Sequence, residues 1–393
     1  MTALARPRPE GRRLSVNRQC HNTIERPGDS RDYRREGLEK TPILRLLFLF
    51  LACAASAALA AESPSVSREQ HWALTDEKFE LALERLRVTE RTLQKIPVLL
   101  VHGFFVNSRF LNLGENQSLA RFLAREGFDV WNLSLRGTGR SLSPLRGGPK
   151  VWSLEDILDH DLPAVVRYVQ QATRSQNLFW VGFELGGLLL YAYGEKQRGQ
   201  GLAAGVTLAA PATFTHPRQE PLKRLLSLND TPWLRNLFLY LNGPLVGRLL
   251  IPSAPPIERF FYNPDNMTDE IKEALLGEAL SEINPGILDQ LVVMIRKGEF
   301  VSSAATYNYR RNLKTIRLPM LVIGGEADPM APPEAIRDVY QALGSAHRSL
   351  KVFGPGSKHS LPFGHFDLIA GKQAPKEVFP VISDWLKQRE RQR

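Results

Sequence analysis

The sequence predicts an α/β fold in which a mostly parallel sheet is flanked by helices and carries an inserted helical region. Two observations lead to this prediction. From about residue 72, short apolar runs alternate with segments of helical apolar spacing, which is the pattern of a parallel sheet covered by helices. Between residues 212 and 318 the strand pattern gives way to helix-like sequence broken by prolines. The chain has 393 residues, 43% of them hydrophobic, so it can fill a large core.

The apolar runs identify the strands. Each run is short, rich in β-branched or aromatic residues, and bounded by glycine, proline or polar residues. Segment 79–88 (FELALERLRV) fits a strand or a helix, and its position ahead of the first core strand favours a strand. The other predicted strands are IPVLLVHG (96–103), FDVWNLSL (128–135), LFWVG (178–182), AAGVTLAAP (203–211), PMLVIGGEADP (319–329) and SLKVFGP (349–355).

Helices are predicted between these strands. Residues 118–126 have helical apolar spacing, and a second helix opens at Ser153 with Asp156 three residues later, as in a capping box. A terminal helix has an apolar stripe formed by Val378, Phe379, Ile382, Trp385 and Leu386.

These patterns divide the chain into four predicted parts. A basic leader with a signal peptide or membrane anchor covers residues 1–61, and the first part of the core covers 62–211. The inserted helical cap covers 212–318, and the second part of the core covers 319–393.

The leader has the shape of an export signal. Arg45 precedes an uncharged run over 46–61, which ends in small residues with an Ala58-Leu59-Ala60 cleavage pattern. The 45 residues before the run are more than an ordinary signal has, so either translation starts at a later residue or the segment stays as an uncleaved anchor. Cys53 allows a third, in which Leu51-Ala52-Cys53 resembles a lipoprotein box. We therefore expect a periplasmic or secreted protein, or one anchored to a membrane through this segment alone.

Composition excludes several classes of site. The two cysteines, Cys20 and Cys53, lie in or before the signal, so the body offers no disulfide framework and no thiolate metal site. The net charge is +10, but residues 1–45 hold eleven Lys/Arg and six Asp/Glu, which is half of the excess. We therefore expect no nucleic-acid partner. No pattern indicates a metal, nucleotide or flavin site, so we expect no cofactor, and the oligomeric state is not indicated.

Several short motifs follow the predicted strands in order. His102-Gly103 follows one strand, LRGTGRS (135–141) the next, and VGFELGG (181–187) stands where a third strand turns into a helix. Asp328 and His365 follow late strands. In this order and spacing the chain from about residue 72 to 388 resembles the α/β-hydrolase family with a helical cap, of the bacterial lipase and esterase kind. HDLPAVVRYV (160–169) is also similar to acid lipases.

The resemblance implies roles for residues around the strand-to-helix turn. The backbone N–H groups of Phe104 and Leu185 would point at a developing oxyanion. Gly182 and Gly186 would allow a tight turn, and LRGTGRS would be a turn rather than a phosphate loop, because it lacks the required lysine and spacing.

Two further residues match the family's acid and base. Asp328 in GGEADPMAP would orient the base, and His365 in FGHFDL would be that base, with His359 as the rival. His102 would shape its loop rather than bind a metal, because no partner residue stands at ligand spacing.

Glu184 stands where the family has its nucleophilic serine, and Phe183 stands before it where the family often has histidine. Three hypotheses remain open. The carboxylate is itself the nucleophile, as aspartate is in haloalkane dehalogenases and epoxide hydrolases of this fold, and forms an ester that His365 helps to hydrolyse. Alternatively, the carboxylate fills the oxyanion hole and pairs with His365, which leaves an inactive protein that binds a ligand. In the third, Glu184 is a general base for a bound water.

The inserted region indicates the kind of ligand. WLRNLFLYLNGPLVGRLL (233–250) is rich in Leu, Phe and Tyr, so we expect an apolar small molecule, although such helices are more often core. Opening an epoxide would use cap tyrosines, for which packing roles are the alternative. The candidates are Tyr240, Tyr262, Tyr307 and Tyr309.

Overall fold

The computed structural model describes residues 65–88, 94–141, 150–227, 247–248, 251 and 255–392. These residues belong to one compact unit, Ser63–Arg393. The predicted leader, both cysteines, Tyr240 and nearly all of the 233–250 stretch lie outside the described residues. Within the described residues no helix is long and apolar enough to cross a membrane.

The described strands form a single eight-stranded sheet in the order β1-β2-β4-β3-β5-β6-β7-β8. β1 and β2 are antiparallel to each other, β2 is antiparallel to β4, and every later pairing is parallel. The strands are β1 (Ser67–Leu74), β2 (Glu80–Arg87), β3 (Val98–Val101), β4 (Val130–Leu133), β5 (Leu178–Phe183), β6 (Leu202–Leu208), β7 (Met320–Gly325) and β8 (Arg348–Phe353).

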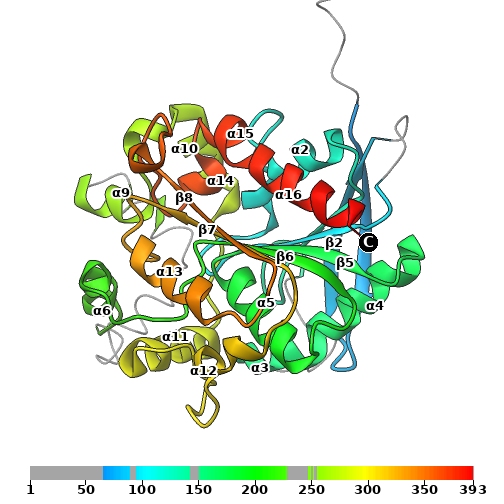
Figure 1. Ribbon diagram of the computed structural model, residues 1–393, viewed down its shortest axis with the longest axis horizontal. Coiled ribbons are helices and arrows are strands. Elements are labelled where there is room, and N and C mark those ends of the chain that lie inside the picture. The colour runs from blue at the N-terminus through cyan, green and yellow to red at the C-terminus, as the bar shows by residue number, and fades with distance from the viewer. Residues whose placement is uncertain are drawn as a thin grey trace, which may run out of the picture. The chain divides into compact units, whose positions relative to one another are not determined.

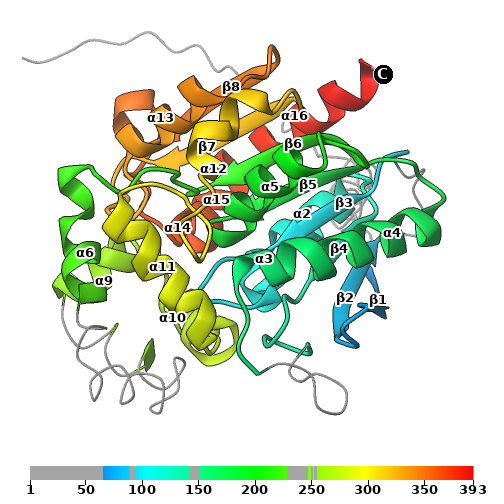
Figure 2. The ribbon, with the colours of Figure 1, turned by 90° about the horizontal axis from the view of Figure 1, so that it is seen from below.

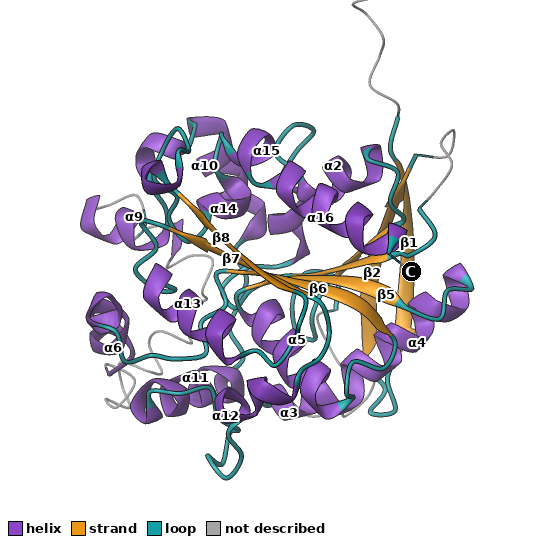
Figure 3. Cartoon of the chain, viewed as in Figure 1, coloured by secondary structure: helices purple, strands orange, loops and turns teal. Residues whose placement is uncertain are grey.

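Helices cover both faces of this sheet (Figures 1 and 3). α2 (Leu119–Arg125) and α16 (Phe379–Arg391) lie on one face, and α4 (Leu162–Thr173), α5 (Leu185–Lys196) and α13 (Pro333–Ala342) on the other. Because both faces are covered, β3 to β7 are buried along their whole length, which is why they appear in the sequence as continuous apolar runs.

The described residues between β6 and β7 form several helices joined by loops, with isolated β-bridges such as Thr213–Glu299 and Val301–Asn308. In Figure 2, several of these helices lie together on the left. The α-helices of this region in the described residues are α6 (Glu220–Ser227), α9 (Pro255–Phe261), α10 (Asp269–Ala274), α11 (Pro285–Lys297) and α12 (Tyr309–Asn312), and the first four are those grouped on the left of Figure 2.

The fold prediction is confirmed, including the ambiguous 79–88 segment, which forms β2. Two local features differ from expectation. β1, an edge strand, was not predicted, because its half-exposed pattern carries no continuous apolar run. The helix that opens at Ser153 has the predicted capping box but is not uniform: it runs from α3 (Leu154–Asp156) through a π-helical turn (Ile157–Asp161) into α4.

Candidate active site

The turn at VGFELGG brings Glu184 to the end of β5 and the beginning of α5. Glu184 has φ 47° and ψ −106°, a region that a residue with a side chain adopts only when its surroundings enforce it. The Glu184 N–H donates to Leu208 O (2.8 Å), and its carbonyl accepts from Gly187 N (3.0 Å). A Cβ atom on Gly182 would overlap Gly186 O, and one on Gly186 would overlap Val101 O, so both glycines are required by the close approach of strand and helix.

The carboxylate of Glu184 turns toward the loop after β3. Its Oε2 accepts a hydrogen bond from Phe104 N at 2.8 Å, so the first predicted oxyanion donor is bonded to the protein's own side chain. Leu185 opens α5, where a backbone N–H has no carbonyl of its own helix to bind. The Glu184 side chain is 14% exposed, so the carboxylate is largely shielded from water.

His365 and Asp328 meet beside this carboxylate. Asp328 Oδ1 accepts from the N–H groups of Met330 and Ala331 (2.8 Å each), and Oδ2 lies 2.8 Å from His365 Nδ1. This contact places a proton on Nδ1 and turns Nε2 toward Glu184 Oε1, 3.8 Å away. That separation is too long for a direct hydrogen bond, and the buried Nε2 has no hydrogen-bond partner within the described residues.

The charges around His365 favour its protonated form. Burial alone would lower the pKa of His365, but the charge and hydrogen bond of Asp328, followed by the negative charge of Glu184, together raise it to about 10. The side chains of His365 and Asp328 are 1% and 0% exposed, so solvent screens these interactions little. The resting centre is therefore an imidazolium between two carboxylates.

Aromatic rings and a buried histidine surround the centre. The rings of Phe183 and Phe366 lie 5.1 and 5.7 Å from the His365 ring, centroid to centroid. His102 is fully buried, contacts Gly103 O through Nδ1 (2.8 Å) and accepts from Leu135 N through Nε2 (3.1 Å). Burial lowers the pKa of His102 to about 4, so it is neutral and joins its own loop to the turn after β4.

The other predicted candidates, His359 and three tyrosines, form hydrogen bonds with residues other than Glu184, Asp328 and His365. His359, the rival base, bonds Gly354 and packs against Phe353. The Tyr307 hydroxyl bonds Glu195, eleven residues along α5 from Glu184 and so about 16 Å from it. Tyr309 bonds Glu155 (3.0 Å), and Tyr262 bonds Glu258 (3.0 Å).

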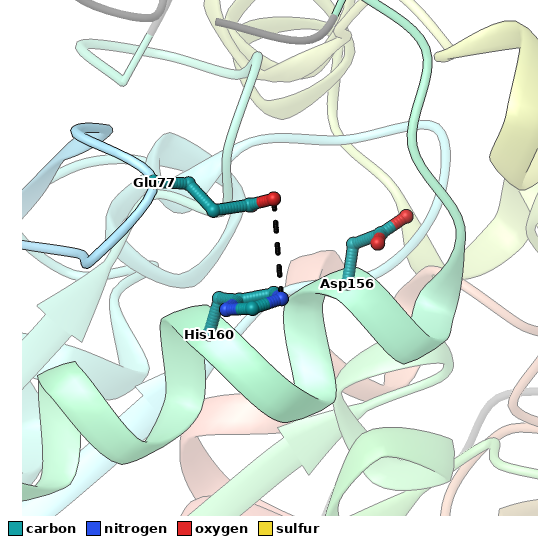
Figure 4. A group of neighbouring side chains, drawn as sticks. All are labelled: Glu77, Asp156 and His160. Carbon is teal, nitrogen blue, oxygen red and sulfur yellow. Dashed lines mark ion pairs between the residues drawn. The ribbon is translucent and has the colours of Figure 1, made fainter.

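A second cluster of ionisable side chains lies between the β1–β2 turn and the start of α4. Glu77, Asp156 and His160 have potential metal-ligand atoms within 4.8 Å of one another. The ion pair of Glu77 Oε1 and His160 Nε2, marked in Figure 4, spans 3.9 Å. Glu77 Oε2 also lies 2.8 Å from Arg136 Nη1, and Asp156 accepts from Ser153 N (2.6 Å) in the capping box. The guanidinium of Arg136 supplies the positive charge beside Glu77, and we assign no metal to this cluster.

Comparison with known proteins identifies the family. The family model described as serine aminopeptidase, S33, matches residues 94–364, which is more than half of the chain. The chain belongs to that family of α/β-hydrolases. Triacylglycerol lipase 1 of Arabidopsis thaliana is 26% identical over 344 residues, 79% of this chain and 84% of that protein.

Other α/β-hydrolases match over different lengths. Lipase member K of Mus musculus is 30% identical over 174 residues, 41% of this chain and 43% of that protein. The chain thus spans less than half of the length of the first curated relatives that it matches, which also include the Homo sapiens form of that lipase. A solved esterase from Thermogutta terrifontis superposes with a TM-score of 0.55 at 20% identity, over 82% of this chain and 99% of that one, which supports the fold alone.

Two residues near His365, Asp367 and Asn266, were not among the predicted site residues. Asp367 is fully buried two residues after the histidine, and Asn266 donates to its carboxylate at 2.9 Å. The spacing from His365 was visible in FGHFDL, but the partner lies 101 residues away and no pattern pointed to it.

Proposed function

We propose that this α/β-hydrolase hydrolyses an apolar small molecule through a covalent ester of Glu184, and that epoxide-like substrates suit the site better than ester-like ones. A single observation carries the proposal. One carboxylate oxygen of Glu184 is bonded to Phe104 N, and the other faces Nε2 of a protonated His365, which has no hydrogen-bond partner among the described residues. One oxygen is thus positioned by the backbone while the other is available to a substrate.

In the first step, a lone pair on Glu184 Oε1 forms a bond to a saturated epoxide carbon, and the ring C–O bond breaks toward its oxygen. That oxygen takes the proton from His365 Nε2. The products are an alcohol attached to Glu184 as an ester and a neutral histidine. A carbonyl substrate is disfavoured, because its developing oxyanion would need the Phe104 N–H that Glu184 Oε2 already occupies.

In the second step, the neutral His365 takes a proton from a water whose oxygen bonds to the Glu184 carbonyl carbon. Negative charge then develops on Oε2, beside Phe104 N. The intermediate releases the diol, whose leaving oxygen takes the proton back from His365. The carboxylic acid formed on Glu184 then returns a proton to His365, so the net reaction adds one water to the epoxide.

The other attributes of the proposal follow the sequence. We propose that the protein acts after export, in the periplasm or outside the cell, and that only the segment before residue 62 would hold it to a membrane. The ligand would be an apolar small molecule bound under the inserted helical region, with no cofactor and no nucleic-acid partner.

The second candidate is a binding protein without turnover. Its supporting observation is that His365 already lies between the carboxylates of Asp328 and Glu184, so its positive charge offsets one of the two negative charges without a substrate. Under this alternative the apolar ligand binds and is released unchanged.

Three forms of the body beginning at Ala61 separate the two candidates. Wild type, Glu184→Gln and Glu184→Ser are assayed with styrene-type epoxides and aryl esters, with Glu195→Gln as a matched control on the same helix. We expect epoxide turnover in wild type and the control, and a loss of at least about 1,000-fold in Glu184→Gln. A single turnover in ¹⁸O-labelled water should place the label in the peptide that contains Glu184.

Two outcomes would contradict the proposal. Equal turnover by wild type and Glu184→Gln would remove the covalent role. A silent wild-type protein, with ester cleavage appearing in Glu184→Ser, would favour the binding protein.

A further inference from the structure

A short segment of the inserted region runs along the loop that carries His365. At the end of α9, Phe261 O accepts from Phe366 N (2.8 Å), and between α9 and α10 Asn263 Nδ2 donates to Pro362 O (2.8 Å). Asn266 accepts through its carbonyl from Lys372 N (2.6 Å) and through Oδ1 from Gln373 N (3.2 Å). The inserted region therefore holds the histidine loop on both sides of His365.

Asp367 lies at the centre of these contacts. Its Oδ2 accepts from Asn266 Nδ2 at 2.9 Å and its Oδ1 from Asn263 N at 3.3 Å. Both Asp367 and Asn266 are 0% exposed. Burial raises the pKa of Asp367 to about 7, although its hydrogen bonds act in the opposite direction. Burying an ionisable acid costs free energy, which the hydrogen bonds from Asn266 and Asn263 offset in part.

The packing around Asp367 leaves little freedom for the histidine backbone. A Cβ atom on Gly364 would lie 2.7 Å from Asp367 Oδ1 and 3.1 Å from the Cα of Tyr262. The residue immediately before His365 is therefore pressed between the carboxylate and the inserted segment. Any movement of Asp367 would move the backbone of His365, two residues away.

We propose that Asn266, acting through Asp367, is a positioning residue for His365. It holds the 364–367 backbone so that Nδ1 stays at Asp328 while Nε2 faces Glu184. The inserted region thus contributes to the geometry of the proton-transfer group as well as to the ligand site. The kinetic consequence rests on the proposed function, whereas the consequence for the imidazole does not.

The matched variants are Asn266→Ala and Asn284→Ala. Asn284 is a second asparagine of the inserted region. Its Oδ1 accepts from Gly286 N (3.0 Å) and Trp152 N (3.1 Å), and its Nδ2 donates to Lys150 O (3.0 Å), so these bonds hold segments other than the His365 loop. Both substitutions remove structural hydrogen bonds, so both should lower the urea midpoint of unfolding by a similar amount. A purely structural role predicts no further difference between them.

The first measurement is the titration of His365 in protein labelled with ¹⁵N-histidine, with His365→Gln identifying the signal. In wild type and Asn284→Ala we expect the imidazolium to persist to about pH 10. In Asn266→Ala the midpoint should fall by one pH unit or more, because the ring is held less closely to both carboxylates. An unchanged midpoint in Asn266→Ala would overturn the proposal.

The second measurement is turnover. We expect kcat to fall about 10-fold or more in Asn266→Ala, with KM changed less than about twofold, and neither to change in Asn284→Ala. If wild type shows no turnover, the proposed function fails while the titration still decides the positioning role. If Asn266→Ala does not fold, the double variant Asn266→Asp/Asp367→Asn replaces it. That variant keeps the hydrogen bond with its polarity reversed, so it should titrate as wild type does, and Asp367→Asn alone should not.

Discussion

Two buried ion clusters in this protein differ in the residue that carries the positive charge, which is a histidine in one and an arginine in the other. In the cluster at the strand ends, an imidazolium lies between Asp328 and Glu184, with one contact of 2.8 Å and one of 3.8 Å. In the cluster below the β1–β2 turn, Arg136 binds Asp161 through two bonds of 2.7 and 2.6 Å. The guanidinium also lies 4.2 Å from the ring centroid of Phe79.

The difference lies in whether the central charge can disappear. Arginine keeps its proton at every accessible pH, and the planar guanidinium matches a carboxylate at two points. The cluster around Arg136 is therefore suited to holding the β1–β2 hairpin against the start of α4. Histidine can lose its proton, and His365 has one ring nitrogen without a hydrogen-bond partner in the described region. The cluster of His365, Asp328 and Glu184 is therefore suited to proton transfer.

The largest effect on stability is expected from breaking the arginine cluster. Arg136→Ala should lower the unfolding free energy by about 3 to 5 kcal/mol, because Asp161 would be left buried without its partner. Urea unfolding measures this loss. Asp161→Asn in the Arg136→Ala background should recover part of this loss. A loss of no more than about 1 kcal/mol in Arg136→Ala would contradict the structural role given to the Arg136 cluster.

The cluster of His365, Asp328 and Glu184 should make the free energy of unfolding depend on pH. The pKa of His365 is raised in the folded state from 6.5 to about 10, so its stabilisation is complete below about pH 6.5 and is lost as the pH rises toward 10. Each pH unit costs at most about 1.4 kcal/mol. Urea unfolding across this range should give a smaller decline for His365→Gln than for wild type, whereas equal declines would show that the folded pKa is not raised.

The smallest effect is expected at the far end of α5. Tyr307→Phe removes a hydroxyl bonded to Glu195 on an exposed ring and leaves Glu184 untouched. Stability should change by about 0.5 kcal/mol or less, and epoxide turnover should stay at the wild-type level. A loss of turnover in this variant would revive the tyrosines as proton donors and would weaken that role for His365.

Much of the fold could be predicted from the chain alone. Strands buried on both faces must be apolar throughout, so β3 to β7 were visible as runs, and Ser153 with Asp156 marked a helix start. β1 was not predicted, because an edge strand that is partly exposed need not be apolar throughout.

The sequence by itself determined the order of the motifs, the identity of Glu184 at the turn, and the candidacy of Asp328 and His365, because each follows a predicted strand. Only the tertiary structure decided that Phe104 N binds the Glu184 carboxylate, that His365 rather than His359 meets Asp328, and that Asn266 reaches Asp367. The physical reason is sequence distance. Local patterns report which face a residue buries, but hydrogen bonds between residues 37 to 101 positions apart depend on how the elements pack.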